Sequence, residues 1–334
     1  TCTATPVAST NTAAACNRPC RIRSGCTAAM NAATPSALGS AHPAFHKAAS
    51  LFDLPIVTTG LDRHYAADLD AMAAVVDERT ILVVGSAGSG KSTTIASMLD
   101  HRNELSTGHV LTFEDPIEYL FRNKKSIINQ REIGSDARTL QAALRSAMRQ
   151  APDVIFIGEI RDRDTMSAAI AYSMSGHLVV ATLHATNSSH ALNRVISFYP
   201  PETRQALFQD MSVAMKAIVS QRLIRSKRGG RVPSVEVLMN TRHIADLIER
   251  GDVAAIKEAM EQSLAPESIS FEQSLYTLIQ ADQITREDAL AAADSQNNLL
   301  WFINNAGKPL TPAERKQRSE SGQDASFSEF TLNI

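Results

Sequence analysis

The sequence predicts an α/β protein that is built on a parallel sheet and followed by a small all-α domain. From about residue 76, short β-branched or apolar runs alternate with segments of helical period, and beyond residue 240 only the helical period remains. An alternation of strands and helices favours a parallel sheet with right-handed crossover connections. The loss of strand-like runs after residue 240 places a domain boundary there.

The composition suits a globular protein of more than one unit. Of the 334 residues, 44% are hydrophobic and 20% are charged, and the formal net charge is -2. No apolar run approaches the roughly 20 residues of a membrane-spanning helix, and no segment near the start resembles a signal peptide, so we expect a cytoplasmic protein. The near-neutral charge indicates no direct binding of nucleic acid, and the basic run "QRLIRSKRGGR" (221–231) is expected to be a solvated loop.

The first fifty residues differ from the rest of the chain. They are rich in Ala, Thr, Ser and Pro, they contain no acidic residue, and they hold all four cysteines. This composition predicts a disordered leader over 1–50, with a transit peptide or an accident of where the sequence begins as alternatives. The cysteines form no CxxC pair and have no matching histidine pair, so they do not favour a metal site.

Four apolar runs are predicted to be strands that are covered on both faces, because they are continuous rather than alternating. They are "ILVV" (81–84), "HVLTF" (109–113), "VIFIG" (154–158) and "LVVATL" (178–183).

Helices are predicted between and after these strands. The segment 136–150 gathers Leu140, Leu144 and Met148 on one helical face, and the segment 163–176 runs to a glycine stop. From Thr241 to about residue 305 the segments are helical, which predicts a C-terminal helical domain over 241–305. The polar segment 306–334 is expected to be a flexible tail.

The most specific motif follows the first predicted strand. "GSAGSGKST" has the G-x-x-x-x-G-K-[ST] spacing and leads into the helix-compatible "TTIASML", so strand, loop and helix occur in the order that a phosphate-binding P-loop requires. Its glycines let backbone N–H groups surround phosphate oxygens, Lys91 reaches the β- and γ-phosphates, and the Ser92 hydroxyl ligates Mg²⁺. The expected nucleotide-binding residues are Gly85, Ser86, Ala87, Gly88, Ser89, Gly90, Lys91, Ser92 and Thr93.

Carboxylates follow two other predicted strands. Glu159 comes just after "VIFIG", in the position of a Walker B residue that supports the metal, and "FEDPIEY" (113–119) carries three acids directly after its strand. The carboxyl ends of parallel strands line the ligand crevice, so these acids would face a nucleotide with its Mg²⁺, and the cation makes their crowding tolerable. One of the three could orient or deprotonate water; position does not say which, and Asp115 could instead only shape the turn.

Together these segments resemble the PilT/PilU family of pilus-retraction ATPases, within the secretion ATPase superfamily. The resemblance covers about residues 78–304 and is carried by five segments in the family's order and spacing. They are "ILVVGSAGSGKSTT", "VLTFEDPIEY", "NQREIGSD", "ALRSAMRQAPDVIFIGEIRD" and "SGHLVVATLHATNS". The resemblance implies a RecA-like P-loop NTPase core over 78–240, ATP and Mg²⁺ as ligands, and assembly into a ring.

The same resemblance assigns roles to single residues. "FEDPIEY" resembles the family's Asp box, whose second glutamate, here Glu118, corresponds to the catalytic base. Glu159 matches the Walker B glutamate, and "GHLVVATLH" resembles the His box, which places His177 and His184 near the active site. His184 follows its strand as Glu159 does, and has the better geometric claim to contact phosphate.

The sequence departs from the family in two places. Family members carry a PAS-like domain of about a hundred residues that lends arginines to a neighbouring subunit, whereas here only 51–77 offers a remnant and no arginine finger can be matched. In the helical part, "NTRHIADLIERGD" resembles the family signature AIRNLIRE but lacks its Arg and Asn, and "REDALAAADSQNNL" is more similar to PilU, the accessory retraction ATPase of the family. No cysteine follows Cys26, so the zinc site of extension-type ATPases is missing, which favours the retraction branch.

These features indicate an ATP-hydrolysing motor, a homo-hexamer or a mixed ring with a paralogous retraction ATPase. It would act on the inner-membrane pilus platform protein from the cytoplasmic side, at the pilus base. Glu118 would activate water, Glu159 would support the metal, and His184 would sense the γ-phosphate. The alternatives are a non-catalytic subunit of a mixed ring, and a DNA-transfer ATPase of a type IV secretion system.

Overall fold

The computed structural model describes residues 80–305, with the exception of 262–267. The predicted leader (1–50), the predicted remnant of an N-terminal domain (51–77) and the predicted tail (306–334) lie outside the described residues. Within them, no helix is both long and apolar enough to cross a membrane.

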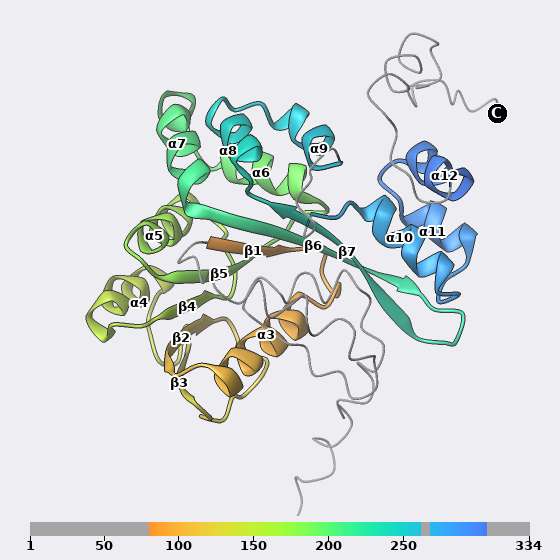
Figure 1. The fold of residues 1–334 in the computed structure, drawn as a ribbon. Helices are drawn as coiled ribbons and strands as arrows, with labels where there is room; N and C mark the ends of the chain where they lie inside the picture. The colour runs from red at the N-terminus through yellow and green to blue at the C-terminus, as the bar shows by residue number, and fades with distance from the viewer. Residues whose placement is uncertain (1–79, 262–267, 306–334) are drawn as a thin grey trace, which may run out of the picture. The chain divides into compact units, whose positions relative to one another are not determined.

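The centre of the fold is a seven-stranded, mostly parallel sheet with the strand order β3-β2-β4-β5-β1-β6-β7 (Figure 1). Only the last pair, β6 and β7, is antiparallel. The strands are β1 (Thr80–Val84), β2 (Gly108–Glu114), β3 (Ser126–Glu132), β4 (Val154–Ile157), β5 (Leu178–Leu183), β6 (Met215–Arg225) and β7 (Arg231–Met239). The predicted α/β class with a parallel sheet is therefore confirmed.

The four predicted strands are present as β1, β2, β4 and β5, and their ends differ from the predicted bounds by at most one residue. The expectation of a solvated loop over 221–231 is wrong. Strand β6 continues to Arg225 and β7 begins at Arg231, so only the short turn between them lies outside the paired strands. Two glycines with positive φ, Gly229 at 88° and Gly230 at 73°, close this hairpin.

Helices lie between the successive strands as far as β6, except between β2 and β3. They are α3 (Lys91–Leu105), α4 (Leu140–Ala147), α5 (Arg163–Met174), α6 (Ser188–Ser197) and α7 (Arg204–Ala214), followed after β7 by α8 (Arg242–Glu249), α9 (Val253–Glu261), α10 (Phe271–Gln280), α11 (Arg286–Ala292) and α12 (Gln296–Asn304). The predicted helix over 136–150 begins later, at Leu140, because Thr139 caps it by accepting a hydrogen bond from Ala142 N.

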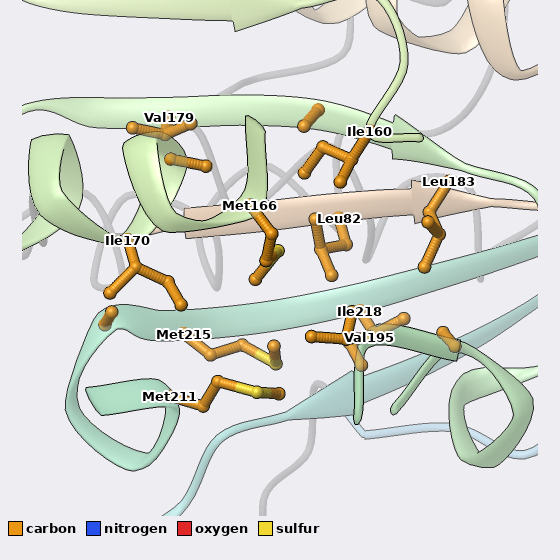
Figure 2. Packing of buried hydrophobic residues seen from close by; sticks show 14 of the residues in the cluster. Leu82, Ile160, Met166, Ile170, Val179, Leu183, Val195, Met211, Met215 and Ile218 are labelled. Carbon is orange, nitrogen blue, oxygen red and sulfur yellow. The ribbon is translucent and has the colours of Figure 1, made fainter. Parts of the chain in front are cut away.

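Both faces of the sheet are buried, which explains the continuous apolar strands. Leu82 and Val84 of β1 point into a core shared with α4 to α9, whereas Ile81 and Val83 point into a core with α3. Figure 2 shows the first core, where Met166 and Ile170 of α5 pack near Leu82 of the sheet.

The helices after β7 belong to two groups. Residues of α8 and α9 join the core on the sheet face, whereas α10, α11 and α12 form a cluster of their own with Ile224 of β6. The domain boundary at 240/241 stays a prediction, because both groups pack against the sheet strands.

Candidate active site

The P-loop connects the end of β1 to the start of α3, as its sequence predicts. The Nζ of Lys91 donates hydrogen bonds to the carbonyl oxygens of Gly85 at 3.0 Å and Ser86 at 2.9 Å, so the ammonium lies within the curve of the loop. No side chain of the described residues caps α3, whose N-cap is Gly90. The N–H groups of its first turn are thus free to meet an anion, which the positive end of the helix also favours.

Two P-loop glycines are required by crowding. A Cβ on Gly85 would lie 2.3 Å from Ser89 Oγ, and a Cβ on Gly90 would lie 2.8 Å from Nε2 of Gln221. Gly90 also has a φ of 89°, where an L side chain is strained. A Cβ on Gly88, which has a φ of 72°, would meet no atom within 4 Å among the described residues other than its chain neighbours, so the loop is open on that side.

The acids of "FEDPIEY" do not share one environment. Glu114 is buried and accepts hydrogen bonds from Thr112 Oγ1 at 2.7 Å and from Gln130 Nε2 at 3.1 Å, so its carboxylate serves the structure. Asp115 lies 3.6 Å from the guanidinium of Arg161. Glu118 is exposed and lines the cavity beside the P-loop. Of the three acids, Glu118 is the one that is free to act on water.

The loop that carries Glu118 is held by β3, a strand that the sequence analysis did not predict. Gln130 donates to the carbonyl of Tyr119 at 2.7 Å and accepts from Phe121 N at 2.9 Å, and Glu132 accepts from Ile117 N at 3.2 Å. These bonds fix the backbone on both sides of Glu118. The Tyr119 hydroxyl also shares a hydrogen bond of 2.8 Å with Thr93 on α3.

Glu159 follows β4 and is the centre of a second cluster. Its Oε2 accepts from Arg161 Nε at 2.6 Å, and its Oε1 lies 3.2 Å from His184 Nε2. A Cβ on Gly158 would lie only 3.0 Å from the carbonyl of Phe113, so glycine lets the end of β4 approach the end of β2. This close approach brings Glu159 to the same edge as the Asp box.

The structure separates the two histidines. His184 follows the carboxyl end of β5 and lines the cavity, whereas His177 precedes the amino end of the same strand. The ring Nδ1 of His177 lies 3.1 Å from the carbonyl of Tyr172 and 3.1 Å from Ser175 Oγ. A strand of six residues spans about 20 Å, so His177 is not brought to the nucleotide pocket of its own chain.

One cavity of about 490 Å³, a volume typical of ligand sites, brings together seven of the predicted site residues, and its lining does not include the predicted Gly85, Ser86, Ser89, Gly90, Thr93 and His177. It is lined by Ala87, Gly88, Lys91, Ser92, Asp115, Glu118, Glu159, Arg161 and His184, together with apolar residues of α3 and the sheet. Burial lowers the pKa of Lys91 below its ordinary value of 10.5, and the charges of Glu159 and Glu118 oppose this shift. Both acids are thus close enough to act on the lysine electrostatically.

These residues fit a nucleoside triphosphate with Mg²⁺. The described residues contain no cluster of three or more His, Cys, Asp or Glu that would hold a metal by itself. A P-loop site does not need one, since the hydroxyl after the lysine, here Ser92, shares the ion with phosphate oxygens. The open loop, the uncapped helix and the nearby Glu159 supply the remaining elements of such a site.

One residue that contacts the site was not among those that the sequence predicted. Gln221 of β6 is 3% exposed and contacts both the P-loop and α3. The hairpin pattern around it, two β-prone runs separated by a glycine pair, could have placed it on a strand, although not beside β1.

The chain is similar in sequence to known secretion and pilus proteins. The family model described as "Type II/IV secretion system protein" matches residues 48–287. The type IV pilus ATPase PilU of Pseudomonas aeruginosa is 45% identical over 231 residues, which cover 69% of this chain and 60% of PilU. The PilT retraction ATPase of the same organism is 38% identical over 218 residues, which cover 65% of this chain and 63% of PilT.

The solved structures agree with these matches. A crystal structure of the pilus retraction motor PilT with bound ADP superposes with a TM-score of 0.61 at 40% identity, covering 65% of this chain and 62% of that one. The chain therefore spans about 60% of the length of the first curated relatives it matches.

Proposed function

The chain belongs to the type II/IV secretion system protein family and, within it, to the PilT/PilU ATPases with their RecA-like core, and on this premise we propose that it hydrolyses Mg-ATP to drive retraction of a type IV pilus. The observation that carries the proposal is the meeting of Lys91, Glu118 and Glu159 around one cavity, although they follow three different strands. Phosphoryl transfer to water requires a cation that binds the phosphates, a base that activates water and a residue that supports the metal, and these three residues would supply them in that order.

In the proposed mechanism the backbone N–H groups of residues 85–92 and the Lys91 ammonium bind the β- and γ-phosphates. Ser92 and Glu159 would hold Mg²⁺, Glu159 through water, and the bound ion would neutralise charge on the phosphate oxygens. The exposed Glu118 carboxylate orients the attacking water and accepts its proton, since it alone of the three Asp-box acids has no structural partner among the described residues.

Arg161 and His184 complete the proposed site. Both contact Glu159, at 2.6 Å and 3.2 Å, and both line the cavity. His184 would sense the γ-phosphate, because a phosphate that draws its Nε2 away from Glu159 changes the position of the loop after β5. Closure of one subunit over the next would convert this change into movement of the pilus platform protein, from the cytoplasmic side of the inner membrane.

The test separates nucleotide binding from turnover. We expect Glu118→Gln to bind a nonhydrolysable ATP analogue with Mg²⁺ as the wild type does and to lose ATP hydrolysis, because the amide cannot accept the proton. Lys91→Ala should lose both properties, since it removes the cation that meets the phosphates. Hydrolysis by Glu118→Gln at the wild-type rate would assign the base to another residue.

A second candidate, an accessory subunit of a mixed ring, is favoured by one observation. The chain is 45% identical to PilU and 38% identical to PilT over comparable lengths. ATP hydrolysis by the purified chain, measured alone and mixed with a full-length PilT-type paralogue, distinguishes the two candidates. A chain that is inactive alone and changes the rate of its paralogue supports the accessory role.

A further inference from the structure

Gln221 is a buried polar residue whose side chain makes hydrogen bonds to the P-loop and to α3. It lies on β6, and the preceding residue, Ser220, pairs with Val84 at the end of β1, directly before the P-loop. Its side chain is 3% exposed. A buried amide must satisfy both its donor and its acceptor within the protein.

The two ends of the amide bind two different parts of the site. Nε2 donates to the carbonyl oxygen of Ser89 at 2.7 Å, and Oε1 accepts from the hydroxyl of Thr94 at 2.7 Å. Ser89 belongs to the second half of the P-loop, and Thr94, itself 3% exposed, belongs to the first turn of α3. Gln221 therefore ties the loop and the helix to the sheet on either side of Lys91.

Two glycines of the P-loop leave no room for a side chain next to Gln221. A Cβ on Gly90 would come within 2.8 Å of Nε2 of Gln221, and a Cβ on Gly85 within 2.7 Å of its backbone carbonyl. The loop thus lies directly against Gln221 at two points 5 residues apart in the motif. Such close packing at the two glycines leaves the loop little freedom to change its path.

We propose that Gln221 is a positioning residue of the nucleotide site, which holds the P-loop and the start of α3 in the arrangement that accepts phosphate. The inference rests on the proposed function, because it concerns the same site. A loop that is already ordered loses less conformational entropy when its N–H groups meet the phosphates, so the clamp increases affinity for the nucleotide. Gln221 touches no reacting atom and acts only through the loop and helix.

The test measures the affinity of the full chain for a nonhydrolysable ATP analogue with Mg²⁺. Gln221→Glu keeps the oxygen that accepts from Thr94 but loses the donor to Ser89, and leaves a buried carbonyl unpaired. We expect its dissociation constant to rise by about tenfold or more. Thr94→Val should weaken binding in the same direction, whereas Thr94→Ser, which keeps the hydroxyl, should bind as the wild type does.

The Thr94 variants keep the test informative if Gln221→Glu does not fold. The matched control is Ser220→Ala on the same strand, because the Ser220 hydroxyl is fully buried and donates to Glu236 at 3.0 Å, away from the P-loop. This variant should lower the melting temperature without changing nucleotide affinity. A purely structural role for Gln221 would make its variants behave like Ser220→Ala.

The inference is overturned if Gln221→Glu and Thr94→Val bind the analogue as tightly as the wild type. Combining Thr94→Val with Gln221→Glu should add little to the larger single effect, because both changes break the same clamp, and full additivity would also contradict the proposal. Failure of the wild type to bind the analogue would instead overturn the proposed function. The two failures are therefore distinguishable.

Discussion

At the scale of single residues, the residues of the candidate site could be predicted where they lie together in one short sequence motif. The P-loop, the Asp box and Glu159 each lie within a short motif that follows a predicted strand, so the sequence alone predicts that they meet at one side of the sheet, and residues of all three line one cavity. Gln221 is different, because it contacts residues that are 127 and 132 positions away in the chain. No local pattern marks such a partner; only the neighbourhood of β6 and β1 in the sheet brings them together.

Glu236 is a residue outside the nucleotide site that gives a prediction on pH. It is 2% exposed, and its Oε1 accepts from Ser188 N at 2.7 Å and from Ser220 Oγ at 3.0 Å. Burial raises its pKa above the ordinary 4.5, and these hydrogen bonds oppose the shift. The folded state thus holds this proton more tightly than the unfolded state does, so the contribution to stability falls as pH rises through the raised pKa.

Glu236→Gln should remove this dependence on pH. The amide keeps an oxygen for both donors and cannot ionise, so the variant should gain stability relative to the wild type as pH rises from about 5 to 8. Urea unfolding of both proteins across this range measures the difference. Parallel curves for the two proteins would show that the carboxyl group titrates alike in the folded and unfolded states.

At the scale of elements, the strands that the sequence predicted are those that are buried on both faces of the sheet. β1, β2, β4 and β5 are buried on both faces and read as apolar runs, whereas β3 lies at the edge of the sheet and mixes Ile128 with exposed or half-buried polar residues. The charged half of β6 was interpreted as a loop for a similar reason. It continues as a hairpin with β7 because Arg222 finds partners in the C-terminal helices.

The role of β3 predicts an effect on turnover. Gln130 binds the Glu114 side chain before Glu118 and the backbone of Tyr119 and Phe121 after it, so Gln130→Leu should free the segment that carries Glu118. We expect kcat for ATP to fall by about tenfold or more, because the base is no longer held in place, while the affinity for ATP changes little. The adjacent Asn129→Ala, whose side chain contacts His109 instead, is the control.

Steady-state kinetics of both variants measure this effect. A loss of kcat in Gln130→Leu with an unchanged rate in Asn129→Ala supports the role of β3. Equal rates in both variants and the wild type would show that the loop needs no support from this strand.

Arg222 joins the C-terminal helices to the strand that supports the P-loop. Its guanidinium donates to the carbonyl of Ala292 at 2.6 Å and to that of Thr186 at 3.0 Å, pairs with Asp294, and lies 3.9 Å over the ring of Phe271. A lysine cannot make these planar, forked contacts. Arg222→Lys should therefore increase hydrogen exchange in α10, α11 and α12 by about tenfold.

The exposed Arg225 on the same strand offers a matched control. Arg225→Lys should leave hydrogen exchange in α10, α11 and α12 unchanged. Equal exchange in the wild type and in both variants would mean that the apolar cluster around Leu275 and Leu299 holds these helices without Arg222.

At the scale of the whole molecule, the part of the cavity that residues 80–305 line has little positive charge. Among its described lining residues, the fixed cations are Lys91 and Arg161, and the guanidinium of Arg161 already binds Glu159. The charge that develops on a transferring phosphoryl group generally needs an additional cation, which many ATPases receive from a neighbouring subunit. This deficit supports a ring in which each site is completed by the next chain.

Mixing active and inactive chains tests the ring. Glu118→Gln chains should enter the ring and bind ATP without hydrolysing it, so each of them should stall neighbours that depend on its cycle. At constant total protein, we expect ATP hydrolysis to fall more steeply than the fraction of wild-type chains, and the activity per wild-type chain to rise with protein concentration, because assembly follows mass action. Chains that work alone would instead lose activity in strict proportion to the mixing ratio and show the same activity per chain at every concentration. That result would leave the proposed nucleotide site intact. It would also mean that the additional cation comes from the same chain, so that Arg161, the arginine of the described cavity, would have to leave Glu159 and bind the phosphoryl group.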